Sequence, residues 1–425
     1  HGGYKLDDAI EDDITDLIGQ DWDRPIGADV GQIWFDDDLA EKSYVGHLLE
    51  SLGTDLHGLR IAVDCANGAA STLGPEALRK AGADVVVINA FPDGENINHE
   101  CGSTHPQQLQ AVVVASEADF GVAYDGDADR CLAVDAKGRL VDGDKIMGLL
   151  AVQMKEEGKL AHDTLVVTVM SNLGLLNAMK AKGITIEQSA VGDRYVLEAM
   201  QAGGYSLGGE QSGHVIAADH ATTGDGVLTS LLIAKAVKTS GKSLEELVSW
   251  IPRLPQILLN VPGVDRTGLE HDGVVEAVAA VEDQLGDDGR VVLRPSGTEP
   301  LVRVMVEAPT QNQAEHSAEV IALRRLRHLV SHRPAACSAA MSTKEGTRMT
   351  QNRFGSSAWH VDPSGNVTSS NDAVGGTVGP DATKDSRFAP SQLAQSGQSK
   401  GGAPASPPPA RVAQPSTGRI PRSDA

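Results

Sequence analysis

The chain has 425 residues, a formal net charge of -22 and 40% hydrophobic residues. That length exceeds what a single hydrophobic core supports and indicates roughly three domains. The acidic balance argues against a nucleic-acid-binding surface, which requires clustered lysine and arginine side chains.

The four cysteines, at positions 65, 101, 131 and 337, show no paired spacing, so they indicate neither a disulfide framework nor a zinc site. His99 and His105 flank Cys101, but no second ligand pair follows them, which argues against zinc there too. No apolar run approaches the ~20 residues needed to cross a membrane, and the N-terminus lacks an export pattern. We therefore expect a cytoplasmic protein without a membrane partner.

Residues 4–19 predict a short amphipathic helix that ends at Gly19. One side of it carries the apolar residues Leu6, Ile10, Ile14, Leu17 and Ile18, and the other side is acidic. The sequence begins at His1 rather than at methionine, so we expect an incomplete reading frame.

A second unit begins near Asp38 with a helix over residues 39–52. It continues with a strand at 59–64, a helix at 75–81 and a strand at 84–89. Strand, helix and strand at this length predict a parallel crossover connection. A helix at 106–115 and a strand at 120–124 then lead to an acidic loop.

In this acidic loop, Asp125, Asp127 and Asp129 alternate with other residues between two short apolar runs. An extended backbone would direct all three carboxylates to one side, where they repel unless a cation lies among them. We therefore predict a Mg²⁺ site, with a solvated acidic turn as the alternative. A calcium loop of the EF-hand type is excluded, because Arg130 and Ala136 stand where that loop requires Gly and Glu.

A third unit, from about Asp142, predicts helices at 144–157 and 174–182 and strands at 164–170 and 184–187. A loop at 190–194 opens a helix to 202, a strand follows at 205–207, and a helix runs from 226 to about 237. Between the last two, Gly209 to His214 offer an acid, an amide and a hydroxyl, groups that suit sugar hydroxyls. A purely structural His214 is the alternative.

A fourth unit, residues 255 to about 329, predicts a strand at 257–261, a helix at 274–285 and two strands around a polar turn within 290–307. Two guanidinium groups, Arg294 and Arg303, and two hydroxyls, Ser296 and Thr298, converge on this turn and suit phosphate oxygens. An ordinary hairpin turn with surface arginines is the alternative. Residues 331–425 lack apolar periodicity and predict a disordered tail, although a frameshifted end would look the same.

Three motifs occur in one order: Asp-Gly-Asp-Ala-Asp-Arg at 125–130, Gly-Glu-Gln-Ser-Gly-His at 209–214 and Arg-Pro-Ser-Gly-Thr-Glu-Pro at 294–300. Together they resemble the α-D-phosphohexomutase family. The glutamine of the second motif and the Cys-Gly-Ser-Thr-His run at 101–105 resemble its bacterial members that act on glucosamine phosphates. The resemblance covers residues 1 to about 320.

The resemblance implies a multi-domain α/β architecture. It assigns a remnant of a first domain to residues 1–38, the metal-loop domain to 39–141 and the sugar-loop domain to 142–250. A smaller α+β phosphate-binding domain occupies 251–330, and the disordered tail occupies 331–425.

The resemblance also implies an isomerase that interconverts glucosamine 6-phosphate and glucosamine 1-phosphate, on the route to UDP-N-acetylglucosamine and peptidoglycan. The phosphoryl group passes through a phosphoserine and glucosamine 1,6-bisphosphate. Asp125, Asp127 and Asp129 are implied as Mg²⁺ ligands, and Arg130 as a charge stabiliser. The implied substrate-binding residues are Asp193, Arg194, Glu210, Ser212, His214, Arg294, Ser296, Gly297, Thr298 and Arg303. A homodimer is a further expectation.

One part of the family pattern is missing. The family's catalytic serine lies in a Thr-Ala-Ser-His-Asn-Pro-like run, which this sequence does not contain. We therefore expect this chain to be inactive alone. A phosphomannomutase or phosphoglucomutase and a non-catalytic sugar-phosphate-binding protein stay open as alternatives.

Overall fold

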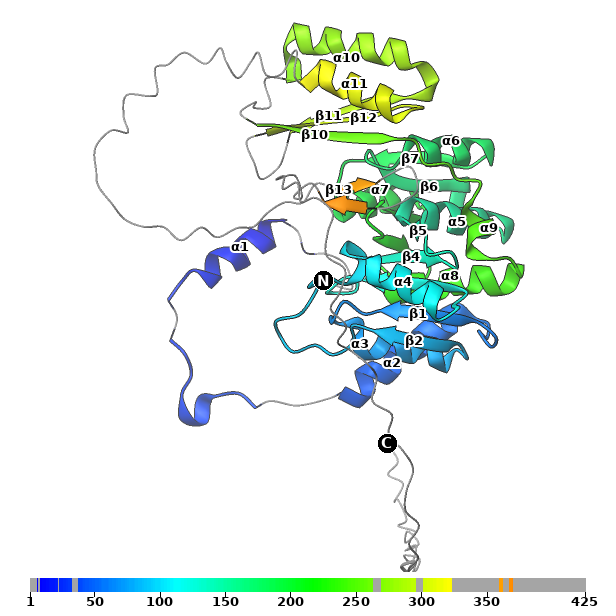
Figure 1. Cartoon of the computed structure of the whole chain (residues 1–425). Coiled ribbons are helices and arrows are strands. Elements are labelled where there is room, and N and C mark those ends of the chain that lie inside the picture. The colour runs from blue at the N-terminus through cyan, green and yellow to red at the C-terminus, as the bar shows by residue number, and fades with distance from the viewer. Residues whose placement is uncertain are drawn as a thin grey trace, which may run out of the picture. The chain divides into compact units, whose positions relative to one another are not determined.

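A computed structural model describes residues 8–21, 23–32, 37–262, 269–295 and 301–322, with Leu6 and two short strands nearer the C-terminus (Figure 1). These residues all fall within the compact unit His1–Asp372. The tail predicted to be disordered, 331–425, lies outside the described residues except for β13 (Trp359–Val361) and β14 (Val367–Ser369). These two strands pair antiparallel, which differs from the expectation at those positions.

The N-terminal part contains α1 (Asp8–Ile18) and a 3-10 turn (Gly27–Asp29), and α2 (Asp37–Leu52) follows. The predicted amphipathic helix is therefore present from Asp8 to Ile18, whereas Leu6 lies outside it. Its apolar side is exposed, with Leu17 at 61% and Ile18 at 79%.

The first sheet has the strand order β2-β1-β3-β4-β5. Its strands are β1 (Arg60–Asp64), β2 (Asp84–Ile88), β3 (Phe120–Tyr124), β4 (Cys131–Asp135) and β5 (Leu140–Val141). The predicted parallel crossover is confirmed, because β1 pairs in parallel with both β2 and β3. β3 and β4 pair antiparallel, so the acidic loop is the turn of a hairpin.

Two helices and a 3-10 turn accompany this sheet: α3 (Ala70–Lys80), α4 (Gln107–Ala115) and Gly102–Thr104. α3 begins five residues before the predicted start at residue 75. In the structure Pro75 lies inside the helix, and Gly74 lies so close to the buried Tyr124 ring that a Cβ there would be 2.8 Å from it.

The second sheet has the order β7-β6-β8-β9. Its strands are β6 (Thr164–Thr168), β7 (Thr185–Ser189), β8 (Leu207–Gly209) and β9 (Val215–Ala217). Its helices are α5 (Gly143–Glu156), α6 (Leu173–Ala181), α7 (Asp193–Gly203), α8 (Gly226–Ser240) and α9 (Leu244–Val248), with a 3-10 turn at Ala161–Asp163. The two segments expected as separate domains share one buried hydrophobic cluster that extends from Val45 to Ile251. α8 joins them by contacting α2, α3, β3 and β4.

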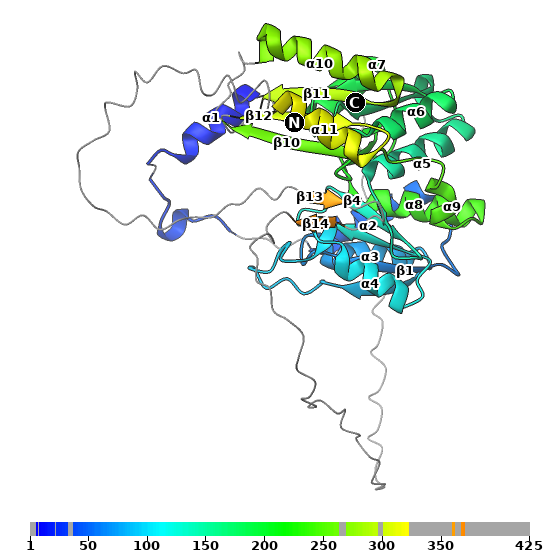
Figure 2. The ribbon, with the colours of Figure 1, turned by 45° about the horizontal axis from the view of Figure 1, so that its top comes forward.

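The third sheet is antiparallel, in the order β10-β12-β11, with β10 (Gln256–Pro262), β11 (Arg290–Pro295) and β12 (Leu301–Glu307). α10 (Asp272–Leu285), a 3-10 turn at Gly286–Asp288 and α11 (Gln311–Ile321) accompany it. Both helices cover the same face of the sheet (Figure 2), and a hydrophobic cluster of their own lies between. Among the described helices none is both long and apolar enough to span a bilayer.

Candidate functional site

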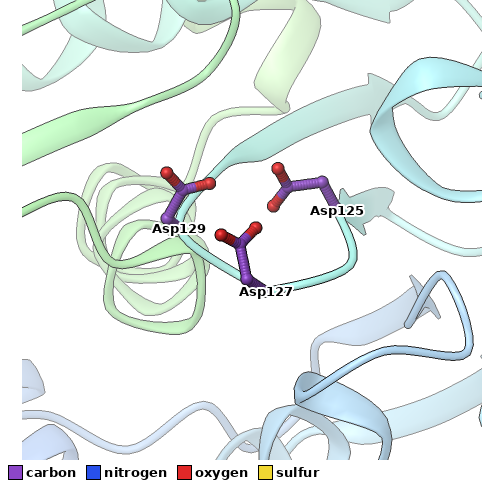
Figure 3. Close-up of side chains that lie close together, drawn as sticks. All are labelled: Asp125, Asp127 and Asp129. Carbon is purple, nitrogen blue, oxygen red and sulfur yellow. The ribbon is translucent and has the colours of Figure 1, made fainter. Parts of the chain in front are cut away.

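The acidic loop between β3 and β4 is a tight turn. The Ala128 N–H donates to the Asp125 carbonyl oxygen (3.2 Å), and Ala128 has a positive φ of 62°. The three carboxylates converge, with one oxygen of each within 4.8 Å of the others (Figure 3). The predicted cluster is therefore present, but the extended backbone was wrong. The turn of the hairpin, rather than alternation along a strand, brings the three side chains together.

The pKa values of Asp125 and Asp129 are shifted in opposite directions. Asp125 is buried, accepts the Arg130 N–H (3.2 Å) and lies 3.0 Å from Arg130 Nε. Burial, followed by the charge of Asp129, raises the pKa of Asp125 to about 6. A hydrogen bond from His214 lowers the pKa of Asp129 to about 2. A cation between the two carboxylates would reduce the cost of ionising both.

The residues of this loop fit a divalent metal ion. Asp129 Oδ1 is buried without a hydrogen-bond partner among the described residues, and the Arg130 Nε atom lies 3.4 Å from it. A buried polar atom of this kind costs free energy unless something binds it. Carboxylate oxygens are ligands that Mg²⁺ prefers, and the single positive charge of Arg130 cannot balance the negative charges of three ionised aspartates. The exposed side chain of Asp127 leaves the cluster open to a ligand.

His214 connects the polar loop after β8 to the acidic loop. Its Nδ1 lies 3.0 Å from Asp129 Oδ2, and its Nε2 accepts the Gly224 N–H (3.1 Å). Because Nε2 accepts, this hydrogen-bond network assigns the proton to Nδ1, which donates to Asp129. The buried imidazole therefore orients a candidate metal ligand.

Backbone hydrogen bonds join the same two loops. The Cys131 N–H donates to the Gly213 carbonyl oxygen (3.0 Å). The acidic loop is also bonded to the start of α8, where the Gly226 N–H donates to the Ala128 carbonyl oxygen (2.8 Å). Arg130 and His214 also form an isolated antiparallel bridge. The structure therefore brings the acidic loop and the polar loop, both predicted from sequence, into direct contact.

The start of α7 lies beside the polar loop. The Gly192 N–H donates to Glu210 Oε1 (3.1 Å), and Asp193 Oδ2 lies 3.9 Å from His214 Nε2. Arg194 pairs with Glu198 one turn along the helix (2.9 Å), and Ser212 is exposed in the polar loop. Asp193 is thus connected to the acidic loop by way of His214, and Glu210 lies in the polar loop that carries His214.

Arg294 on β11 and Arg303 on β12 are directly opposite each other in the strand pair. Burial, followed by the charge of Arg303, lowers the pKa of Arg294. Arg294 Nε is buried and has no hydrogen-bond partner in the described part of the chain. Like charges at opposed positions destabilise a sheet, and an anion between them would relieve the repulsion. The other predicted members of this site, Ser296, Gly297 and Thr298, lie outside the described residues.

A buried carboxylate behind the acidic loop was not predicted. Asp64, the last residue of β1, accepts the N–H groups of Ala66 and Gly102, both at 3.0 Å. Gly102 has a positive φ, and a Cβ there would lie 2.5 Å from the Tyr124 carbonyl oxygen. Asp64 therefore fixes the segment around Gly102 directly against the residue that precedes Asp125. The available signal was an acid at the carboxyl end of a buried strand, where α/β sheets bind ligands.

Models of three phosphoglucomutase/phosphomannomutase domains match the chain. The alpha/beta/alpha domain II matches residues 42–138, the alpha/beta/alpha domain III matches residues 142–254, and the C-terminal domain matches residues 258–324. A phosphoglucosamine mutase from Bifidobacterium animalis subsp. lactis is 60% identical over 320 residues, which cover 74% of this chain and 70% of that protein.

Two solved structures resemble the fold. An N-acetylglucosamine-phosphate mutase of the alpha-D-phosphohexomutase superfamily, in a product complex, aligns with a TM-score of 0.55 and 21% identity. The alignment covers 66% of this chain and 65% of that one. Aspergillus fumigatus N-acetylphosphoglucosamine mutase, solved with GlcNAc-6P and magnesium, gives a TM-score of 0.56 and 22% identity over 67% of this chain and 70% of that one. The chain thus spans between 65% and 70% of the length of these three proteins.

Proposed function

The chain belongs to the phosphoglucomutase/phosphomannomutase family, and on that premise we propose that it serves the interconversion of glucosamine 6-phosphate and glucosamine 1-phosphate. The similarity to a phosphoglucosamine mutase at 60% identity supports an amino sugar as substrate. In the proposed isomerisation a phosphoserine donates its phosphoryl group, glucosamine 1,6-bisphosphate forms, and the other phosphate returns to the serine. The product would feed UDP-N-acetylglucosamine and peptidoglycan precursor synthesis.

The observation that carries this proposal is the connection between the acidic and polar loops. Phosphoryl transfer depends on positioning and on electrostatic stabilisation, so the groups that hold the phosphoryl oxygens and the sugar must lie together. The hydrogen bonds from Cys131 to Gly213 and between His214 and Asp129 hold the two loops in direct contact.

We propose Asp125, Asp127 and Asp129 as ligands of Mg²⁺. When bound there, the ion would supply positive charge for the oxygens of the transferring phosphoryl group. Arg130 keeps Asp125 and Asp129 in place and adds a positive charge beside them. His214 fixes the orientation of Asp129.

The substrate would be held at both ends. We assign Glu210 and Ser212 to the sugar hydroxyls, with Asp193 and Arg194 beside the ligand. Arg294 and Arg303, together with Ser296, Gly297 and Thr298, would bind the phosphate that does not react.

Cys65, Cys101 and Cys131 are buried free thiols, which supports a reducing, cytoplasmic location.

Calorimetry of sugar phosphate binding in the presence of Mg²⁺ tests the proposal. We expect glucosamine 6-phosphate to bind at least about tenfold more tightly than mannose 6-phosphate or glucose 6-phosphate, since a built site discriminates by its polar contacts. Equal binding of the three would favour the phosphomannomutase or phosphoglucomutase alternative, and no binding would refute the proposal. Binding is the direct measure, because the sequence contains no Thr-Ala-Ser-His-Asn-Pro-like run.

The metal assignment has its own matched pair of variants. Asp127→Asn should weaken Mg²⁺ binding in calorimetry, because it removes one of three converging carboxylates. Asp283→Asn makes the same change on the exposed face of α10 and should leave Mg²⁺ affinity unchanged. Equal Mg²⁺ affinity in both variants would contradict the assignment.

A further inference from the structure

The N-terminus of α6 receives two carboxyl groups, one from helix α5 and one from strand β12 of the third sheet. Asp144, in the first turn of α5, accepts the Asn172 N–H (2.8 Å). Glu307, the last residue of β12, accepts the N–H of the adjacent Leu173 (3.0 Å). Both side chains are buried, Asp144 at 2% exposure and Glu307 at 0%. Consecutive backbone amides therefore connect the second sheet's helices to the end of the third sheet.

Arg290, the first residue of β11, completes this contact. Its Nε donates to Glu307 Oε2 (2.5 Å), and its Nη2 donates to the Ser171 carbonyl oxygen. Asn172 adds two further bonds, because its Nδ2 donates to the Leu254 carbonyl oxygen (3.0 Å) and its Oδ1 accepts the Leu254 N–H (2.9 Å). We call Asp144, Ser171, Asn172, Leu173, Arg290 and Glu307 the α6 joint.

The α6 joint continues to the polar loop through Gln211. The Gln211 Nε2 donates to Asp144 Oδ2 (2.9 Å), and the Gly143 N–H donates to the Gln211 carbonyl oxygen (3.0 Å). The amide of Gln211 therefore points at a buried carboxylate, although its neighbours Glu210 and Ser212 are assigned to the sugar. Hydrogen bonds run without a break from the polar loop to the paired ends of β11 and β12.

The arginine pair lies at the other end of the same two strands. Arg290 pairs with Glu307, and Arg294 pairs with Arg303 four residues along, which is about 13 Å of strand. A paired β-ribbon is stiff over that length, so the position of the joint determines where the two guanidinium groups lie. A misplacement of about 1 Å is enough to weaken a contact with a bound group.

We propose that Glu307 and Arg290 are positioning residues, which hold the Arg294–Arg303 strand pair in place relative to the polar loop so that one hexosamine phosphate contacts both. The inference rests on the proposed function for its ligand. Neither residue needs to touch the ligand, because both act through the first turn of α6. A ligand that contacts only the arginine pair should be insensitive to the joint.

Two ligands separate positioning from simple folding of the third sheet. In calorimetry, Glu307→Ala should weaken glucosamine 6-phosphate binding about tenfold and leave the binding of inorganic phosphate unchanged. Glu307→Gln should lose less affinity for glucosamine 6-phosphate, because the amide oxygen of glutamine can still accept the Leu173 N–H. Glu276→Gln, on the exposed side of α10, makes the same charge change and should have no effect. Equal weakening of both ligands by Glu307→Ala and Glu307→Gln would overturn the inference.

A measurement without ligand keeps the two proposals distinct. In hydrogen exchange followed by NMR, Glu307→Ala, which removes the acceptor, should speed exchange of the Leu173 amide more than that of the Asn172 amide, which bonds to Asp144 instead. Unchanged protection of Leu173 would show that Glu307 does not hold α6 and would overturn the joint. If the unmodified chain binds no glucosamine 6-phosphate, the proposed function fails, and the exchange experiment still decides whether the joint exists.

Discussion

His214 gives a candidate metal ligand its orientation. We predict that His214→Ala weakens Mg²⁺ binding by about ten- to hundredfold, the usual cost of losing a residue that orients a ligand. His214→Asn should restore most of the affinity, because its amide can donate to Asp129 Oδ2 in place of Nδ1. Calorimetric titration with Mg²⁺ measures both, with circular dichroism as the check on folding. Equal affinity in the Ala and Asn variants would argue that the hydrogen bond does not matter.

Arg294 should matter for binding but not for folding. Without ligand, Arg294→Ala should not lower the midpoint of thermal unfolding, because it relieves repulsion from Arg303. Glucosamine 6-phosphate binding should fall at least about tenfold, since charged hydrogen bonds contribute about 1.5–3 kcal/mol each. Calorimetry and thermal unfolding test the two halves. Arg79→Ala, at an exposed position on α3, is the control, and a fall in thermal stability with unchanged binding would make Arg294 a structural residue.

At the residue scale, the sequence predicts groupings of residues that are neighbours in the chain, but not contacts between distant residues. The converging carboxylates of Asp125, Asp127 and Asp129 were predictable because five consecutive positions contain all three. Asp64 was not predictable, because its partner Gly102 is 38 residues away in the chain. The link from Gln211 to Asp144 spans 67 residues. No local pattern reports which distant amide a buried carboxylate accepts.

At the scale of elements, the loop between β1 and α3 is packed directly against the acidic loop. A Cβ on Gly68 would lie 2.2 Å from the Gly126 carbonyl oxygen, and the Ala69 N–H donates to that same oxygen (2.8 Å). We predict that Gly68→Ala lowers the free energy of unfolding by about 1–3 kcal/mol, the usual cost of overpacking. It should also weaken Mg²⁺ binding, because the loop that carries the proposed ligands must shift.

Urea unfolding and Mg²⁺ calorimetry measure the two effects of Gly68→Ala. Gly46→Ala, inside α2 with no atom within 4 Å of the new Cβ, is the matched control. It should stabilise the protein by up to about 1 kcal/mol, because alanine favours a helix interior over glycine. If the two variants proved equally stable, the close approach of the loops would not be a constraint.

Most strands were predictable from sequence, because apolar runs bounded by polar or glycine residues mark both ends. β3 matches its predicted range, and β1 begins one residue later than predicted. α11 was missed, because the side chains it buries, Ala314, Ser317, Ala318 and Ile321, are mostly small and give a weak apolar pattern. Small residues can pack as closely as large ones, but they leave little periodic signal.

At the scale of the whole molecule, length predicted several domains, but it could not assign cores to them. Residues 39–141 and 142–250 were assigned to two domains. One hydrophobic cluster extends across both, and each segment also has a smaller cluster of its own. α8 is apolar and buried on nearly every side, so its sequence predicts a buried helix but not which elements cover it. The third sheet has its own core, so it depends on polar contacts such as the α6 joint for its place.

The pH dependence of overall stability offers a last prediction, centred on Asp144. Burial, followed by the charge of Asp142, raises the pKa of Asp144 from 3.8 to about 7. The folded state therefore binds this proton more tightly than the unfolded state does. Stability from the protonated carboxyl is fully present below about pH 4 and is lost as pH rises through about 7.

Asp144→Asn keeps the neutral form at every pH, so it should remove this loss. We predict that the free energy of unfolding of Asp144→Asn, relative to the unmodified chain, rises between pH 4 and pH 8 by at most about 4 kcal/mol, since each pKa unit corresponds to about 1.4 kcal/mol. Urea unfolding at each pH measures the difference, in which groups unaffected by the substitution cancel. Asp283→Asn, at an exposed site, should track the unmodified chain throughout. Parallel curves for Asp144→Asn and the unmodified chain would mean that the pKa of Asp144 is the same in the folded and unfolded states, and that the hydrogen bonds from Asn172 and Gln211 offset its burial.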